Sequence, residues 1–216
     1  MNPDEPKTNV YCTNWSTCMQ NTETPPACGT TMTDGRDGNT YTTATVGGTC
    51  WMTKNLRFTG TNLIPEESNV TSDITMSYGN LTSGNSYTEA RIATGSTTAY
   101  GAYYNYCAAS AGQACSSSSQ TDATRSVCPA GWKLPTQAQL NAVPQFDSRF
   151  TASSGLAGYY SGGSLLGVGS DVSWWASTAD DATRQYYLGY YGDDGDWDVL
   201  GSIKTEGNSI RCVRAN

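Results

Sequence analysis

The sequence predicts an α+β domain in which short helices and small antiparallel sheets are joined by long irregular loops and stapled by disulfides. Leu, Ile, Val and Phe together supply only 27 of 216 residues, whereas aromatic residues make up 11% and cysteine occurs eight times. One segment has the pattern of a short helix, and several have the pattern of short strands. The net charge of -7 is too small to favour a disordered chain. We therefore expect a folded domain with a core of Tyr, Trp, Ala and Cys.

Composition divides the chain into two parts. Residues 1–30 hold three of the cysteines and four of the eight prolines but few aliphatic side chains. We interpret them as a cysteine-containing extension or stalk junction. Residues 31–216 form the domain itself, which is long enough to bury roughly 70% of the surface of its unfolded chain.

The first elements expected in the domain are a hairpin and a second short strand. Asp-Gly pairs at Asp34 and Asp37 precede the β-rich stretch 40–46, and "TCWM" follows at 49–52. Asp34, Asp37 and Asn39 could be calcium ligands, but Asp-Gly and Gly-Asn are first of all turn formers. We prefer the turn.

A short helix is expected after residues 59–126, which are rich in Ser, Thr, Asn and Gly and predict irregular surface connections. Pro135 disfavours helix just before it, and Thr136 is a suitable N-cap. Gln139 completes the capping-box pattern, so that Leu140 and Val143 would face inward.

The end of the chain reads as four strands, at 173–178, 184–191, 196–203 and 208–214. Asp194-Gly195 predicts a two-residue hairpin turn between the second and the third of them.

The run "YYLGYYGDDGDWD" (186–198) is the candidate binding surface. Strand alternation places Tyr186, Leu188 and Tyr190 on one face and Tyr187 and Tyr191 on the other. Leu188 marks the buried face, so Tyr187 and Tyr191 would point outward beside an acidic turn.

Tyrosine and tryptophan offer large, stiff contact area, and Gly, Ser and Asp add adaptable polar contacts, as in antibody paratopes and interface hot spots. Trp197 and "GYYSGG" (158–163) could extend this surface, whereas Trp174 and Trp175 are expected to be structural. The candidate ligand-binding residues are Tyr187, Tyr190, Tyr191, Asp193, Asp194, Asp196 and Asp198.

The even number of cysteines indicates disulfides and an extracellular or cell-surface location. A zinc cluster is disfavoured because the chain has no histidine and no C-x2-C pair. The cysteines allow about 105 pairings. We expect Cys12–Cys18, Cys28–Cys50, Cys107–Cys115 and Cys128–Cys212.

Several classes of function are disfavoured by composition. Four lysines and eight arginines, scattered along an acidic chain, argue against nucleic acid as a partner. No apolar run approaches the roughly 20 residues of a membrane helix, so no membrane insertion is expected. "NPDEPK" after Met1 lacks the apolar segment of a secretory signal, and we expect an exported form to have lost an upstream signal or anchor.

Catalysis is not expected either, so we assign no catalytic residue and no cofactor. Without histidine the commonest general base is missing, and Ser-His or Cys-His nucleophiles are impossible. Two carboxylates within 193–198 could in principle serve a glycosidase, but turn formation and solubility explain them better. Calcium is a weak alternative. Asp194, Asp196 and Asp198 have the first spacings of an EF-hand loop, but Val199 and Thr205 stand where Gly and Glu are needed.

Five motifs occur in the order typical of one family: "DGRDGNTYTTATVGGTCWMTKNL", "YGAYYNY", "VCPAGWKLPT", "WWAST" and "SIRCVR". Over about residues 31–216 the chain resembles the Fibrobacter succinogenes major paralogous domain. It departs from that pattern at Gln139 and Leu140, where an acidic residue and Trp often follow "LPT". The resemblance implies a C-type-lectin-like fold with neighbouring chain ends, which a Cys128–Cys212 bridge would suit.

Proteins of that fold include lectins, formylglycine-generating enzymes and variable proteins of diversity-generating retroelements, so the fold alone does not decide function. The Glu-Pro-Asn, Gln-Pro-Asp and Trp-Asn-Asp motifs of calcium-dependent lectins are missing. We therefore expect an adhesin-like or receptor-like domain that binds a protein or glycan on another cell surface. Its C-terminal segment would be the place for retroelement diversification, with Trp197 kept as scaffold. The alternative is a pilus or surface-layer subunit that self-assembles. The sequence leaves its oligomeric state open.

Overall fold

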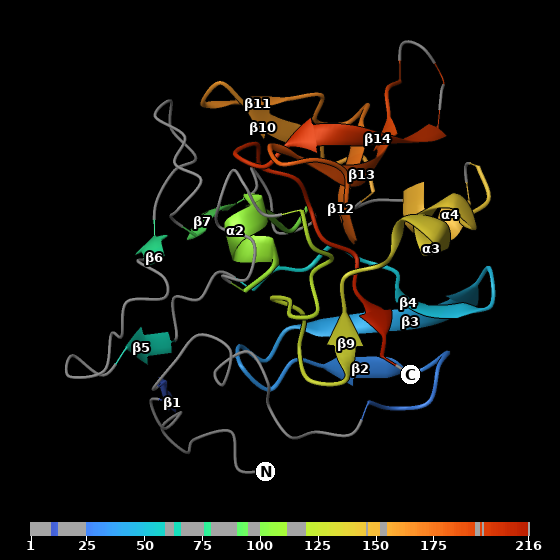
Figure 1. Ribbon diagram of the computed structural model, residues 1–216. Helices are drawn as coiled ribbons and strands as arrows, with labels where there is room; N and C mark the ends of the chain where they lie inside the picture. Colours follow the sequence, from blue (N-terminus) through green and yellow to red (C-terminus); the bar gives the residue numbers. More distant parts are fainter. Residues whose placement is uncertain are drawn as a thin grey trace.

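The computed structural model confirms mostly antiparallel small sheets, few short helices and disulfides in the described residues (Figure 1); the pairs β1–β5 and β6–β7 are parallel. For four short strands only the backbone is described: β1 (Val10–Cys12), β5 (Leu63–Pro65), β6 (Met76–Tyr78) and β7 (Ala90–Thr94). The rest of the described chain comprises residues 25–58, 100–111, 120–145, 147–151, 155–192, 195 and 197–215. The expected division at residue 30 stays a prediction, since residues 1–9 and 13–24 lie outside the description.

The larger sheet contains the strands nearest to both ends of the domain. In spatial order it comprises β2 (Thr31–Thr33), β3 (Thr40–Val46), β4 (Thr49–Met52), β15 (Val213–Arg214) and β9 (Trp132–Lys133). All its pairs are antiparallel. The hairpin and the second strand predicted from 31–56 are therefore confirmed.

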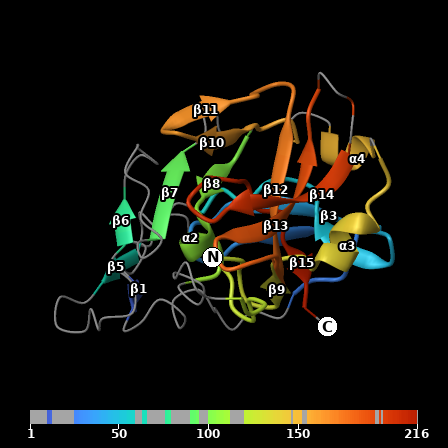
Figure 2. The same cartoon turned by 45° about the horizontal axis from the view of Figure 1, so that its top comes forward.

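A second, three-stranded sheet lies above the first in Figure 1. Its antiparallel order is β12 (Val172–Ala179), β13 (Arg184–Tyr190), β14 (Trp197–Ile203). The hairpin of β10 (Tyr159–Ser161) and β11 (Ser164–Leu166) lies beside it, as Figure 2 shows. A third small sheet pairs β6, β7 and β8 (Ala102–Tyr104).

Two features of the predicted C-terminal strands are wrong. The described ladder between β13 and β14 ends at the pair Tyr190–Trp197, and Gly195 donates its backbone N–H to the carbonyl of Tyr191. The connection is thus a longer loop and not a two-residue turn. The strand expected at 208–214 is reduced to β15, because Asn208 and Ser209 make only isolated bridges to Tyr104 and Trp174.

The predicted helix is confirmed as α3 (Gln137–Asn141). Thr136 caps it, and the side chain of Gln139 accepts a hydrogen bond from the Thr136 backbone N–H in a complete capping box. Leu140 and Val143 are buried, so the departure from the family pattern at Leu140 leaves that residue packed in the core. Two short helices were not predicted: α2 (Tyr106–Ala109) and α4 (Ser148–Thr151).

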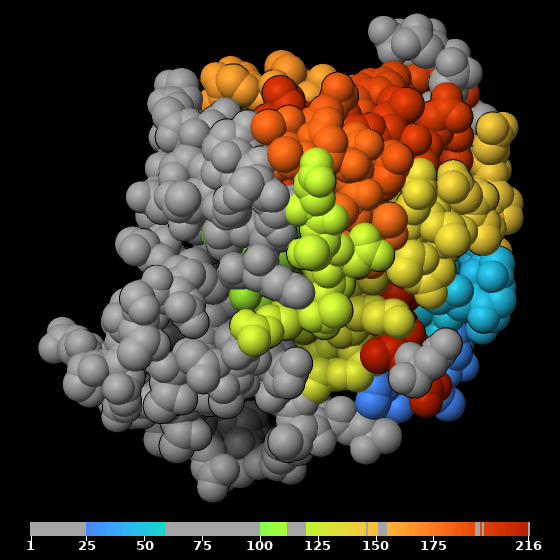
Figure 3. Space-filling view, in the orientation of Figure 1, coloured from blue at the N-terminus to red at the C-terminus, as the bar shows by residue number. Residues whose placement is uncertain are grey.

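Two hydrophobic clusters lie on opposite faces of the three-stranded sheet. One contains Trp175 together with β4, α2 and Cys128–Cys212, and the other contains Trp174 with Trp51, Phe150 and α3. Both Trp174 and Trp175 are fully buried, which confirms their structural role. Figure 3 shows the red and orange strands of this sheet at the top of the molecule, above the yellow helices and the cyan hairpin.

Two of the predicted disulfides are confirmed. Cys28 bonds Cys50, and Cys128 bonds Cys212. Cys107 is also disulfide-bonded, but the expected pairs Cys12–Cys18 and Cys107–Cys115 involve side chains outside the described part of the chain. The two bridges indicate an oxidising environment. Among the described residues there is no helix with the length and hydropathy of a membrane span.

The described ends of the domain meet at Gly131. The backbone N–H of Ala215 donates to the Gly131 carbonyl at 2.8 Å. A Cβ atom at Gly131 would lie only 2.0 Å from Cγ of Pro25, so the proline ring packs directly on the glycine. Pro25 and Ala215 therefore lie close together beside β9, at the edge of the larger sheet.

Candidate functional site

The faces predicted for β13 are correct, but the exposure predicted for Tyr187 is wrong. Leu188 packs in the cluster of Trp174, with Tyr186 and Tyr190 against it, as alternation predicts. Tyr187 points to the opposite face, where it is only 7% exposed because a second core covers that face. Its ring packs on the edge of Trp175, with 6.5 Å between the ring centroids.

Tyr187 is connected to a half-buried residue through its hydroxyl. A Cβ atom at Gly189 would lie 3.0 to 3.3 Å from the outer atoms of the Tyr187 ring, so this ring lies across Gly189. The Tyr187 hydroxyl hydrogen-bonds the hydroxyl of Tyr191, which is half-buried. Burial, followed by the hydrogen bond to Tyr191, raises the pKa of Tyr187 above that of an ordinary tyrosine. The Tyr187 hydroxyl is therefore neutral at physiological pH.

The β10–β11 hairpin supplies a third tyrosine. Tyr159 meets Tyr191 edge to face, with ring centroids 6.2 Å apart and planes at 89°. This is a favourable aromatic geometry. Since Tyr191 follows the end of β13, the contact joins the hairpin to the three-stranded sheet and places Tyr159, one of the residues 158–163, beside Tyr191.

Glu206 brings a carboxylate to the same place. Its two oxygens accept hydrogen bonds from Ser161 at 2.9 Å and from Ser202 at 2.5 Å. Glu206 and Tyr159 both act electrostatically on the Tyr187 hydroxyl and disfavour its ionisation. The carboxylate is thus held beside the tyrosines by hydroxyl donors from β10 and β14.

Two side chains of β14 point to the same side of the sheet as Tyr187. The register pairs Leu200 with Tyr187 and Asp198 with Gly189, and directly paired residues point to the same side of a sheet. Both Leu200 and Asp198 are exposed. We name the resulting site the aromatic surface; it consists of Tyr159, Tyr187, Tyr191, Asp198, Leu200 and Glu206.

The structure brings together only some of the predicted ligand-binding residues. Tyr187, Tyr191 and Asp198 belong to the aromatic surface, with Tyr187 contributing little more than its hydroxyl. Tyr190 lies on the other face, tilted against Trp197 with 5.9 Å between the ring centroids. Trp197 is itself buried in that cluster, so its predicted outward position is also wrong. The predicted ligand residues Asp193, Asp194 and Asp196 lie outside the described residues.

Glu206 and its two serine partners were not predicted as site residues from the sequence. Ser161, Ser202 and Glu206 come from β10, β14 and the loop after β14, so no local spacing connects them. The one available signal was indirect. Glu206 is an isolated acid between a predicted strand and the final segment, and such a residue is usually solvated.

The alternative calcium ligands of the first hairpin are engaged by the chain itself. Both carboxylate oxygens of Asp34 accept from the guanidinium of Arg36, at 2.9 and 2.7 Å, and Arg36 lies 4.0 Å above the Phe58 ring. Asp37 accepts from the backbone and the side chain of Asn39 at 2.8 and 2.7 Å. The predicted turn at residues 34–39 is therefore confirmed. Among the described residues no group of three or more Cys, Asp or Glu is placed to hold a metal.

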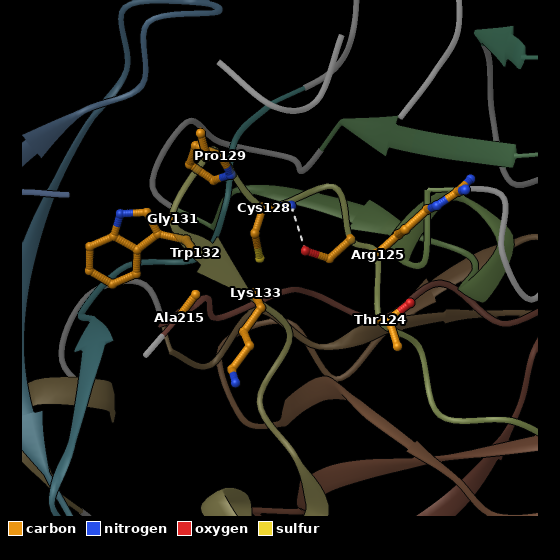
Figure 4. Close-up of a pocket in the computed structure, with 10 residues that line it drawn as sticks. Thr124, Arg125, Cys128, Pro129, Gly131, Trp132, Lys133 and Ala215 are labelled. Atoms are coloured by element: carbon orange, nitrogen blue, oxygen red, sulfur yellow. Dashed lines mark hydrogen bonds between the residues drawn. The ribbon is translucent and has the colours of Figure 1, made fainter. Parts of the chain in front are cut away.

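A pocket of about 410 Å³ is a second candidate site (Figure 4). Cys128 of the buried disulfide lines it, and the Ser126 hydroxyl accepts from the Cys128 backbone N–H at 3.3 Å. Its two cations, Arg125 and Lys133, extend away from one another in Figure 4. Because these charged groups do not converge on one point, the aromatic surface is the better candidate.

These features define a disulfide-stapled, β-rich domain with an aromatic surface shared by a sheet and a hairpin. Residues 44–146 match the Fibrobacter succinogenes major domain family. This match supports the resemblance over those residues, whereas the motifs at 174–178 and 209–214 lie outside the matched range. No curated protein and no solved structure matches the chain. The C-type-lectin-like topology stays a prediction, and the aromatic surface lies beyond the family match.

Proposed function

We propose that this chain is an extracellular ligand-binding domain of the adhesin or receptor type, without catalytic activity, and that it contacts its ligand through the aromatic surface. The observation that carries the proposal is the support of Tyr191. Its half-buried ring is fixed by the Tyr187 hydroxyl from below and by Tyr159 from the side. A tyrosine held in this way offers contact area at little cost in conformational entropy.

The position of the aromatic surface supports display to a partner. Pro25 and Ala215 both contact Gly131 beside β9 on the larger sheet. The aromatic surface lies on β10, β13 and β14, which occupy the other end of the molecule in Figure 1. A partner or tether that holds the domain beside β9 would therefore leave this surface exposed on the far side.

A protein or glycan on another cell surface is the proposed ligand. Aromatic faces stack on both peptides and sugar rings, while Asp198, Glu206 and the serine hydroxyls supply polar contacts. The proposal requires no metal. The absence of histidine from the chain supports binding over catalysis.

Retroelement diversification remains part of the proposal, and the structure sharpens its expected pattern. Codons of exposed residues such as Asp198 and Leu200, and of Tyr191, can vary without loss of the core. Tyr187 and Trp197 are buried and should stay fixed. Deep amplicon sequencing of the gene from a natural population tests this expectation, since variation at the two buried codons or a uniform C-terminal segment would contradict it.

Binding itself is tested with Tyr191→Ala on an array of bacterial surface proteins and glycans. We expect this variant to lose at least tenfold in affinity for the ligand of the parent protein, which is the loss that corresponds to about 1.4 kcal/mol. Leu166→Ala is the matched control, because Leu166 is exposed on β11 but does not belong to the aromatic surface. Equal affinity of Tyr191→Ala and the parent protein would reject the proposed surface.

Self-assembly as a pilus or surface-layer subunit is the second candidate. β14 is an edge of its sheet and carries exposed Leu200 and Ile203. Such an edge can pair with another chain. Light scattering at rising concentration separates the two functions, since a ligand receptor should keep the mass of a monomer and an assembly subunit should not.

A further inference from the structure

We propose that the aromatic surface recognises a cationic group, namely a protonated amine or guanidinium on an aliphatic stem, as carried by lysine and arginine side chains. This inference rests on the proposed binding function and specifies the chemistry of its ligand. Three features of the site support it: an uncompensated carboxylate, neighbouring aromatic rings and a second acid at the other end of the surface.

The first feature is the state of Glu206. Its oxygens accept hydrogen bonds from the neutral hydroxyls of Ser161 and Ser202. No lysine or arginine in the described part of the chain forms an ion pair with it. Glu206 is half-buried, so its charge is only partly compensated by solvent and by two neutral donors.

The nearest cations along the chain are used elsewhere. Lys204 donates its ammonium to the carbonyl of Ala182 at 3.0 Å and is itself buried. The Arg184 guanidinium donates to the carbonyl of Gly201. Neither side chain is therefore directed at Glu206, and a cation supplied by a ligand would complete the site.

The second feature is the set of tyrosine rings beside this carboxylate. A cation over the face of an aromatic ring is attracted by the negative face of the ring system. The planes of the Tyr159 and Tyr191 rings lie at 89° to each other, so the two rings form a corner and not a stack. The Tyr187 hydroxyl is kept neutral by burial and by its bond to Tyr191, so it offers an additional acceptor oxygen.

The third feature is charge at both ends of the surface. Glu206 lies at the Ser202 end of β14, and Asp198 lies opposite Gly189 at the other end, with exposed Leu200 between them. An aliphatic stem can pack on Leu200 while its charged head meets a carboxylate. The net charge of -7 would further steer a basic partner toward the molecule.

The test uses small probes of defined charge and tyrosine-labelled protein observed by NMR. The charged probes are Nα-acetyl-lysine amide, Nα-acetyl-arginine amide and tetramethylammonium, and the neutral probe is Nα,Nε-diacetyl-lysine amide. We expect the lysine and arginine probes to shift the Tyr191 and Tyr159 signals, with affinity about tenfold above that of the neutral probe. Tetramethylammonium distinguishes a simple quaternary cation from a side-chain-like donor, because it cannot hydrogen-bond Glu206.

Two variants locate the charge effect. Glu206→Gln should lower the affinity for the lysine probe about tenfold. Asp180→Asn removes the same charge from the opposite face, near Gly201, and should lower it less than twofold because exposed charges are screened. Equal responses of the two variants, or equal binding of the charged and neutral lysine probes, would overturn the inference.

The outcomes also separate this inference from the proposed function. Binding of neutral saccharides or of the diacetylated probe that depends on Tyr191 but not on Glu206 would keep the binding function and reject the cationic ligand. If the array and the probes both show no dependence on Tyr191, then both proposals fall.

Discussion

The Tyr187 hydroxyl hydrogen-bonds the Tyr191 hydroxyl, which connects a core residue of the three-stranded sheet to a half-buried residue of the aromatic surface. The two tyrosines belong to the same sequence pattern and point to the same face of β13. They nevertheless have different roles, since Tyr187 packs on Trp175 in the core whereas the half-buried ring of Tyr191 meets Tyr159 and the Tyr187 hydroxyl. Tyr187 supports the aromatic surface from the core, and Tyr191 offers its half-buried ring as part of that surface.

Alanine substitutions should separate these two roles. Tyr187→Ala leaves a cavity beside Trp175 and should lower the free energy of unfolding by about 3 to 4 kcal/mol. Tyr191→Ala removes a half-buried ring and should cost less than about 1 kcal/mol. Denaturant unfolding of both variants measures the difference. A stability of Tyr187→Ala within 1 kcal/mol of the parent protein would contradict the burial of that ring.

Gly189 should affect stability through its close contact with the Tyr187 ring. Alanine there reduces the flexibility of the unfolded chain, which stabilises by about 0.4 to 1 kcal/mol. Its Cβ would also lie 3.0 Å from the Tyr187 ring, and the resulting overpacking costs about 1 to 3 kcal/mol. Because Trp175 and Tyr191 hold this ring, we expect Gly189→Ala to destabilise by about 1 kcal/mol.

A double-mutant cycle provides the control for Gly189. In a Tyr187→Ala background the ring is absent, so Gly189→Ala should become neutral or stabilising. The same destabilisation in both backgrounds would show that backbone strain, and not the contact with Tyr187, decides the effect.

The sequence predicted the faces of β13 correctly but not their exposure. Alternation of side chains is a property of one strand, and it separated Leu188 from Tyr187 and Tyr191 as observed. Whether a second layer covers the other face depends on distant segments, here α2 and the residues around Trp175. An abundance of aromatic side chains therefore predicted a contact surface where Tyr187 and Trp197 in fact complete two cores.

Local hydrogen bonding decided which elements were predictable. The capping box of Thr136 and Gln139 and the turn at Asp34 are closed by residues within a few positions, so their patterns identified them. The helix α2 is capped by Asn105 in the same way, but it is only four residues long and carries no amphipathic period. Glu206 could not be predicted as a site residue, because its partners come from separate strands.

The buried ion pair of the first hairpin gives a prediction that also tests calcium. Asp34→Asn removes the carboxylate that pairs with the buried guanidinium of Arg36, and breaking such a buried pair costs about 3 to 5 kcal/mol. The loss should be the same in calcium and in chelator, because the Asp34 oxygens already bond Arg36. Thermal unfolding under both conditions measures it.

Asp37→Asn is the matched control in the same turn. Burial raises the pKa of Asp37, so its charged form is already disfavoured, and the amide keeps one acceptor for the Asn39 backbone N–H. We expect a change below about 1 kcal/mol. If chelator lowers the melting temperature of the parent protein and Asp34→Asn abolishes that response, the hairpin binds a metal after all.

Alkaline pH should unfold the domain through its buried tyrosines. Burial raises the pKa of several phenols above the ordinary value of about 10. They are Tyr41, Tyr103, Tyr104, Tyr106 and Tyr187. A raised pKa in the folded state means that their stabilising effect is complete below pH 10 and is lost as the pH rises further, because the unfolded chain ionises first.

Each such tyrosine contributes a slope of up to about 1.4 kcal/mol per pH unit above pH 10. Denaturant unfolding between pH 8 and pH 11, with phenolate absorbance as a second signal, measures the sum. Tyr106→Phe is the control, since it keeps the ring against Trp175 and removes one ionisable hydroxyl. The free energy of unfolding of this variant should fall less steeply with pH, by the contribution of one tyrosine. Phenols that ionise near pH 10 in the folded protein, without loss of stability, would show that solvent reaches this core.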